Sequence, residues 1–174
     1  MVGGGGSRVG YQVIKELLEL RESVVAVEMD SEALLLGELF EMLRARGIDD
    51  VFHPHPLTEE AARARAGYRG KDLYFLLCRE NHALGYGMLR GWDEGYDTPS
   101  LGIVIHPDVQ GQGLGRLLME FLHVAARRRG ARKIRLRVHS KNHRAISLYQ
   151  SLGYELNPDD TAPYLVGLLD LTVE

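Results

Sequence analysis

The sequence has almost no cysteine: Cys78 is the single thiol among 174 residues. One thiol excludes an intrachain disulfide and is too few for a cysteine-rich zinc site, so we expect no bound metal. There is also no apolar run of the roughly 20 residues that a membrane helix requires, and the first residues lack the order of charge and apolarity typical of a signal peptide. We therefore expect a soluble, cytoplasmic protein with no membrane partner.

Neither sign of charge is in large excess. The 21 basic and 24 acidic side chains give a formal net charge of −3, so the overall charge does not indicate a nucleic-acid partner. With 174 residues, 45% of them hydrophobic, the chain is long enough to bury a core and short enough to form one compact domain. We assign residues 24–174 to that domain and residues 1–23 to a glycine-rich extension with a helix.

Hydrophobic periodicity and turn residues predict an alternation of helices and strands. The expected elements are a helix over 11–23, a strand over 24–29, a helix over 32–47 capped by Asp30 or Ser31, a helix from Thr58 to Gly67 or Gly70, strands over 72–80 and 83–92 joined at Asn81-His82, a strand over 100–107, a helix over 114–130, a strand over 133–140, a helix over 143–153, and strands over 154–156 and 164–171. This order is typical of a mixed α/β layer.

A glycine loop, HPDVQGQGLG at residues 106–115, connects a predicted strand to a predicted helix. Glycines at 111, 113 and 115 remove side chains from the first turn of that helix, so a ligand can approach the backbone. Because helix N-termini have unpaired N–H groups and partial positive charge, the loop is a candidate site for a phosphate or pyrophosphate. The alternative is that the glycines only permit a tight turn.

Two motifs in this order resemble the GNAT superfamily of N-acetyltransferases. The first is Gln-x-x-Gly-x-Gly at residues 110–115, and the second runs from Asn142 through Ala145 and Tyr149 to Leu-Gly-Tyr at 152–154. The resemblance covers roughly residues 24–171 and implies an α/β fold of the α+β type, with a mixed, mostly antiparallel central sheet flanked by helices. It also implies acetyl-CoA as co-substrate and an acceptor that bears a primary amine.

The resemblance also assigns roles to individual residues. The backbone of residues 111–116 would bind the pyrophosphate, and the pantetheine arm would lie between two splayed strands, 103–105 and 134–138. Asn142 would contact the arm or the neighbouring backbone. The implied acetyl-CoA contacts are Ile103, Val104, Ile105, Gln110, Gly111, Gln112, Gly113, Leu114, Gly115, Arg116 and Asn142.

Tyr149 would be the general acid. Attack of an amine on a thioester places charge on the carbonyl oxygen and then on the departing sulfur, which a positioned O–H group can stabilise or protonate. The unperturbed pKa values of a phenol and a thiol lie within about two units of each other, which suits this transfer. The alternative is a packing role, since Tyr149 shares a helical face with Ala145 and Leu152.

The general base is open. Many members of the superfamily have a glutamate on the strand before the glycine loop, where this chain has Ser100 and no acid. The candidates are Glu28, His53, His55, Glu94, Asp97 and His106, any of which could act through a water molecule. Histidine titrates near neutrality, but the His-Pro steps could equally stiffen the loop, and His106 with Pro107 could simply end a strand.

Two other segments have alternative interpretations. The loop RGWDEGYDTPS at 90–100 could bind an amine through Trp92, Tyr96 and its acids, or could be a solvated hairpin tip. For the basic residues at 127–141 we rank a solvated surface first, the 3′-phosphate of CoA second and a nucleic acid third.

The first glycine run, GGGGSRVG at 3–10, partly resembles the dinucleotide-binding unit of potassium-uptake regulators, with Glu28 at the ribose-binding position. Because Ser7 replaces the second glycine of the motif and no first strand precedes it, we do not expect NAD binding. Two rival hypotheses for the chain stay open. One is a CoA or nucleotide sensor without turnover, and the other is transfer of a different acyl group or transfer to an O-acceptor. Assembly as a homodimer is also open.

Overall fold

The structure is a computed structural model that describes residues 22–50, 52 and 54–172. The predicted helix over 11–23 and the first glycine run lie outside the described residues, apart from Glu22 and Ser23, which belong to the first strand. The helices and strands are β1 (Glu22–Ala26), α2 (Asp30–Ala45), α3 (Glu59–Ala66), β2 (Leu73–Arg79), β3 (His82–Arg90), β4 (Ser100–Ile105), α4 (Leu114–Arg128), β5 (Lys133–His139), α5 (His143–Ser151), β6 (Glu155–Pro158) and β7 (Tyr164–Asp170), with short 3-10 turns at Ile48–Asp50 and Pro107–Val109.

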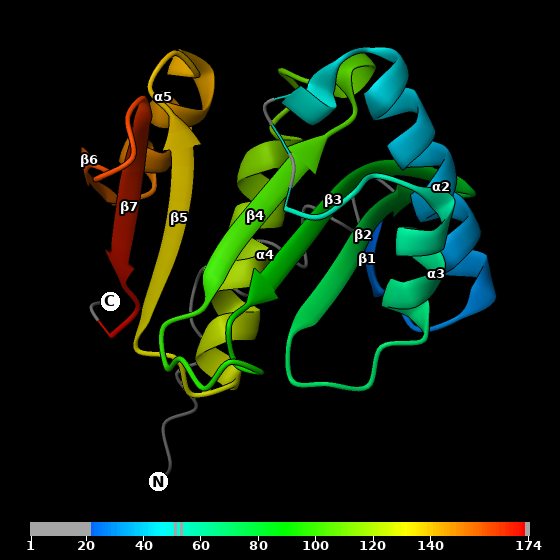
Figure 1. The fold of residues 1–174 in the computed structure, drawn as a ribbon, viewed down its shortest axis with the longest axis horizontal. Helices are drawn as coiled ribbons and strands as arrows, with labels where there is room; N and C mark the ends of the chain where they lie inside the picture. Colours follow the sequence, from blue (N-terminus) through cyan, green and yellow to red (C-terminus); the bar gives the residue numbers. More distant parts are fainter. Residues whose placement is uncertain (1–21, 51, 53, 173–174) are drawn as a thin grey trace, which may run out of the picture.

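The strands form one seven-stranded sheet in the order β1-β2-β3-β4-β5-β7-β6 (Figure 1). Every neighbouring pair is antiparallel except β4 and β5, which are parallel. The expected mixed, mostly antiparallel sheet flanked by helices is thereby confirmed. No helix in the described part of the chain is long and apolar enough to span a membrane.

The sheet has a hydrophobic core on each face because side chains of a strand alternate between its two faces. Helix α4 covers one face, where Leu77, Leu89 and Leu101 are buried. Helices α2 and α3 cover the other, where Leu76 and Met88 are buried. Each face of the central strands is therefore fixed by packing against helices, and the register of β3 against β4 is fixed with it.

The single parallel pair is short. Strands β4 and β5 are paired only at Ser100–Arg135 and Leu101–Leu136, after which they diverge (Figure 1). Strand β5 continues along its whole length against β7, from Lys133 to His139. The two strands thus splay apart as expected, and the opening between them lies next to the loop that follows β4.

Local signals in the sequence set most of the boundaries. The Thr58 side chain accepts a hydrogen bond from the Ala61 N–H (3.2 Å) and caps α3, as predicted. The expected cap of α2 was wrong, because the N-cap is Met29 and the Glu32 carboxylate accepts from its N–H (2.9 Å). Asp30 lies inside the first turn of α2, where its negative charge suits the helix dipole.

The hairpin between β2 and β3 turns one residue earlier than expected. His82 pairs with Arg79, so the turn residues are Glu80 and Asn81, and Glu80 takes a positive φ of 53°. Periodicity locates a hairpin more reliably than it selects the two residues of its turn.

Two glycines in β3 leave room for close packing, Gly85 against β4 and Gly87 against α4. A Cβ on Gly85 would lie 2.8 Å from Ile105 Cδ1 and 3.0 Å from the Val104 carbonyl oxygen. A Cβ on Gly87 would lie 3.0 Å from Leu122 Cδ1 on α4. The close approach holds the beginning of α4, and with it the glycine loop, against the end of β4.

We expect Gly85→Ala to lower the free energy of unfolding by about 1–3 kcal/mol, since the new methyl group meets a backbone oxygen that cannot rotate away. Gly37→Ala is the matched control, because a Cβ there meets only Glu59 Cγ at 3.7 Å. In the middle of α2, that change should stabilise the protein by about 0.5–1 kcal/mol. Urea denaturation of the two variants checks both signs, and equal effects would contradict the packing argument.

Candidate functional site

A cleft of about 1260 Å³ lies where β4 and β5 separate. One wall consists of β4 and the glycine loop, and the other consists of the second half of β5 with α5. The loop between β3 and β4 lines one end, and Phe52 and Pro54 also line the cleft. The cleft therefore joins the two motifs that the sequence contains.

The glycine loop has the backbone conformation of an open helix terminus. Gly111 and Gly113 have φ values of 88° and 85°, in the left-handed region that favours glycine. Gly113 is the N-cap of α4, no side chain caps this helix, and a Cβ on Gly113 would have no atom within 4 Å. The first-turn N–H groups of α4 are thus accessible at the cleft, which fits a pyrophosphate.

Gln110 connects this loop to two other parts of the site. Its amide Nε2 donates to the Ile105 carbonyl (3.2 Å), and its Oε1 accepts from Arg144 Nη1 (3.0 Å). A Cβ on Gly111 would lie 3.3 Å from Arg144 Nη2, so the Arg144 guanidinium lies directly beside the loop. Gln110 therefore holds a positive charge next to the candidate anion site.

Arg144 was not among the residues expected at the site. It lies in the first turn of α5, where a cation is unfavourable for the helix dipole. A basic residue at this position is a signal that sequence reasoning could have used. Asn142, which was expected, also lines the cleft, and its side chain accepts from the Ala145 N–H (3.2 Å) to cap α5.

The edges of β4 differ in what they can bind, because successive residues of a strand direct their backbone groups to alternate edges. The His106 N–H donates to the Leu84 carbonyl on the β3 side (2.8 Å). The Pro99 carbonyl accepts from the Arg135 N–H on the β5 side (2.9 Å). The backbone N–H and C=O groups of even-numbered residues of β4 are therefore directed toward β3, and those of odd-numbered residues are directed toward β5.

This alternation separates the three expected contacts on β4. The backbone groups of Ile103 and Ile105 face the cleft beyond the point where β5 departs, and the Ile105 carbonyl accepts from Gln110. Val104 lines the cleft, but its backbone groups are directed to β3, where it pairs with Tyr86. Of the residues expected in the glycine loop, Gln112 alone does not line the cleft.

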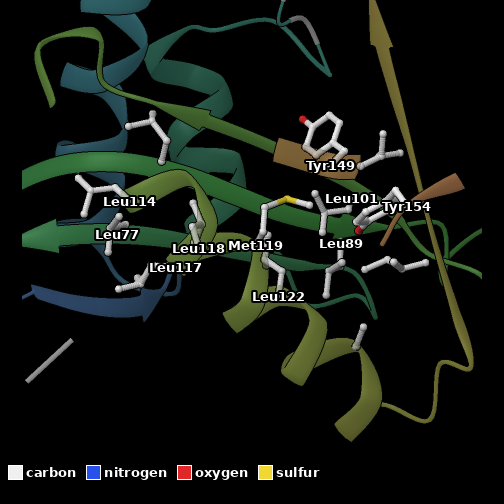
Figure 2. Packing of buried hydrophobic residues seen from close by; sticks show 14 of the residues in the cluster. Leu77, Leu89, Leu101, Leu114, Leu117, Leu118, Met119, Leu122, Tyr149 and Tyr154 are labelled. Atoms are coloured by element: carbon white, nitrogen blue, oxygen red, sulfur yellow. The ribbon is translucent and has the colours of Figure 1, made fainter. Parts of the chain in front are cut away.

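Tyr149 lines the cleft from α5 and is only 8% exposed. Burial raises the pKa of its hydroxyl to about 12, so the phenol keeps its proton at neutral pH. Its ring lies 5.8 Å from the ring of Tyr154, whose hydroxyl forms a hydrogen bond with His123 Nε2 (2.9 Å). Figure 2 shows Tyr149 and Tyr154 at the border of the hydrophobic core, near Met119.

The base candidates are distributed unevenly. Glu94 and Asp97 line the cleft and are exposed. Glu28 and His106 are not among its lining residues. His53 lies outside the described residues.

His55 is not among the residues that line the cleft. Its Nδ1 lies 2.8 Å from the Pro56 carbonyl, which can only accept, so Nδ1 carries the proton and Nε2 accepts from the Tyr86 hydroxyl (3.1 Å). Burial, with smaller contributions from Arg65 and Arg90, lowers the pKa of His55 to about 4. Both ring nitrogens of His55 are engaged inside the protein.

Comparisons with known proteins agree with this geometry. Residues 36–154 match the Acetyltransferase (GNAT) family. A mycothiol acetyltransferase of Rhodococcus opacus (strain B4) is 29% identical over 177 residues, covering 89% of this chain and 58% of that protein. The [ribosomal protein bS18]-alanine N-acetyltransferase of Escherichia coli (strain K12) is 46% identical over 117 residues, covering 67% of this chain and 76% of that protein. The chain thus spans little more than half the length of the mycothiol acetyltransferase that it matches.

Solved structures share the fold. The GNAT domain of S. lividans PAT superposes with a TM-score of 0.72 at 16% identity, covering 84% of this chain and 89% of that one. The yncA structure from Salmonella typhimurium, described with its cofactor acetyl-CoA, superposes with a TM-score of 0.66 at 19% identity, covering 87% of this chain and 94% of that one.

We expect stability to fall between pH 6.5 and pH 4 because His123, behind Tyr154, is buried as the neutral imidazole. Burial lowers the pKa of His123 from 6.5 to about 4. The unfolded chain therefore takes up the proton first, and a contribution of about 3 kcal/mol that is complete above pH 6.5 disappears as the pH falls through the folded pKa. Urea denaturation at pH 7 and pH 4.5 should show a smaller loss for His123→Gln than for the wild type. An equal loss of unfolding free energy in the variant and the wild type would contradict this role of His123.

Proposed function

The chain belongs to the Acetyltransferase (GNAT) family, and on this premise we propose that it is an acyltransferase that transfers the acetyl group of acetyl-CoA to a primary amine. The observation that carries the proposal is the separation of β4 from β5, which opens a cleft with the glycine loop at one end and Tyr149 in its wall. The acetyl group arrives activated as the thioester of CoA.

The chain's own groups fit CoA along the cleft. The first-turn N–H groups of α4 and the Arg144 guanidinium would hold the pyrophosphate, since both supply positive charge at the glycine loop. The backbone of Ile103 and Ile105 offers hydrogen bonds to the amides of the pantetheine arm, as an added strand would. Asn142 lies beside this path at the beginning of α5.

Tyr149 is the proposed general acid. Its high pKa keeps the hydroxyl protonated at neutral pH, so the O–H group can donate a hydrogen bond to the negative charge that develops on the thioester oxygen and then on the departing sulfur. The contact with Tyr154, itself hydrogen-bonded to His123, fixes the Tyr149 ring at the cleft.

Two carboxylates are the proposed proton acceptors for the attacking amine. Glu94 and Asp97, from the loop after β3, line the cleft, whereas the neighbouring strand position has Ser100 in place of an acid. A carboxylate on the loop can accept the proton directly or through one water molecule. We propose this role for the loop in preference to His55, whose ring nitrogens already have partners.

The names of the relatives do not agree on an acceptor. One relative is named as a mycothiol acetyltransferase, and another is named as an N-acetyltransferase of an alanine of ribosomal protein bS18. A primary amine is the acceptor chemistry that we propose for this chain. The rival hypotheses are transfer of another acyl group and CoA sensing without turnover.

We expect Tyr149→Phe to lower kcat for acetyl transfer about 100-fold, with little change in the Kd for acetyl-CoA, because general acid catalysis contributes about 10²–10⁴-fold. Tyr154→Phe is the matched control. It removes a phenol hydroxyl from the same aromatic group, but that hydroxyl faces His123 and not the cleft. It should reduce stability by about 1 kcal/mol and kcat by no more than a few-fold. Equal kcat values for Tyr149→Phe and the wild type would remove Tyr149 from this role.

We expect Arg144→Gln to weaken acetyl-CoA binding about tenfold, because the guanidinium supplies a charge-assisted hydrogen bond at the loop. Its removal should not destabilise α5, since a cation in the first turn opposes the helix dipole. Arg128→Gln removes an exposed arginine at the other end of α4 and serves as the control. Isothermal titration with acetyl-CoA at two salt concentrations measures the effect, and unchanged affinity in Arg144→Gln would exclude the contact.

A further inference from the structure

A row of three side chains crosses the sheet where the cleft begins. Arg90 on β3 pairs with Ser100 on β4, and Ser100 pairs with Arg135 on β5. Directly paired residues of neighbouring strands have their side chains on the same face. The two arginines therefore flank a small side chain, and all three residues line the cleft.

The row faces away from α4. The residues next to the three in sequence are buried in the core against α4, namely Leu89, Leu101 and Leu136. Because side chains alternate along each strand, Arg90, Ser100 and Arg135 project to the opposite face. That face lies across the sheet from α4, while Tyr149 packs into the core on the α4 side. The row is thus on the face of the sheet that α2 and α3 cover, opposite the face on which Tyr149 packs.

The two arginines of this row have no acidic side chain in direct contact. Among the described residues, no ion pair includes Arg90 or Arg135, although Asp159, which binds Arg137, is also within reach of the charge of Arg135. Arg90 Nη1 donates to the Pro54 carbonyl (2.7 Å), a neutral partner, and its Nε is buried without one. Arg137, two residues further along β5, provides the contrast because its Nε binds Asp159 Oδ2 (2.6 Å) and its guanidinium stacks on a ring.

The row is also remote from the proposed pyrophosphate site. Ser100 begins β4 and the glycine loop follows its end at Ile105, so the two sites are separated by five residues of strand, about 17 Å. Glu94 and Asp97, from the loop between β3 and β4, line the same end of the cleft as the row. Positive and negative groups therefore face the same end of the cleft, as a ligand with both charges requires.

We propose that the acceptor is an amine that also carries a carboxylate, as a free amino acid does, and that Arg90 and Arg135 bind this carboxylate on either side of Ser100. Guanidinium groups are suited to carboxylates because their N–H donors match the two oxygens. The carboxylates of the loop attract the amino group of the same molecule. This inference rests on the proposed acetyl transfer and specifies its substrate class.

The experiment compares free L-amino acids with the corresponding L-amino-acid amides as acceptors for the full chain with acetyl-CoA. An amide retains the amine and the side chain and lacks only the charged carboxylate. CoA release gives kcat/KM, corrected for the fraction of neutral amine because the amide is the weaker base. Isothermal titration of each acceptor into the protein saturated with CoA gives an affinity that does not depend on turnover.

Wild-type protein should prefer the acid to the amide by at least tenfold in both measurements. Arg135→Gln, an exposed change, should reduce this preference at least fivefold while kcat/KM for the amide stays within twofold. Arg90→Gln should act in the same direction. Lys133→Gln is the matched control, since it removes a charge from the same strand face outside the cleft, and it should retain the wild-type preference.

Equal use of acid and amide by the wild type, or a preference unchanged in both arginine variants, would overturn the carboxylate site. Acetylation of amidated peptides but not of free amino acids would also overturn the carboxylate site. That result would leave the proposed acetyl transfer intact. Failure of the proposed function would be visible separately, as absence of acetyl-CoA binding in a direct titration without any acceptor.

Discussion

The parallel pairing of β4 with β5 stops after two residue pairs, and the position of every group in the candidate site follows from that interruption. Up to Leu101 the two strands satisfy each other's backbone groups, and beyond it the β5-facing edge of β4 is available to a ligand. The divergence is sustained because β5 pairs fully with β7 and β4 pairs with β3 along its length. The cleft is thus a gap inside a sheet whose two halves are each well paired, with α4 packed behind it.

The sequence was most informative where a local rule applies. Alternation predicts β5, and a capping threonine before an alanine-rich segment predicts α3. The glycine loop has positive φ values at Gly111 and Gly113. Because glycine is the residue that adopts positive φ most readily, the sequence itself indicates these positions. Tyr149 and Asn142 could be expected from the resemblance of their segment to the GNAT superfamily, and both line the cleft.

What the sequence could not show are contacts between residues far apart in the chain. Gln110 and Arg144 are 34 residues apart, and Arg90 and Arg135 are brought into one row only by the register of three strands. His55 shows the same limit. The sequence left open whether this histidine is a base or a loop residue. In the structure its ring nitrogens lie against the Pro56 carbonyl and the Tyr86 hydroxyl, and burial lowers its pKa to about 4. Whether a titratable side chain is accessible depends on tertiary packing, which a motif does not encode.

The alternation of side chains along β3, β4 and β5 also bears on how such a protein can change over time. Leu89, Leu101 and Leu136 hold the core, while Arg90, Ser100 and Arg135 lie one residue away on the other face. Substitution of the second set alters the chemistry of the cleft without opening a void in the first. Residues that fill the core and residues that line the cleft therefore alternate along the same strands. Under the proposed carboxylate site, single replacements in the second set would exchange one kind of acceptor for another while the apolar core stays filled.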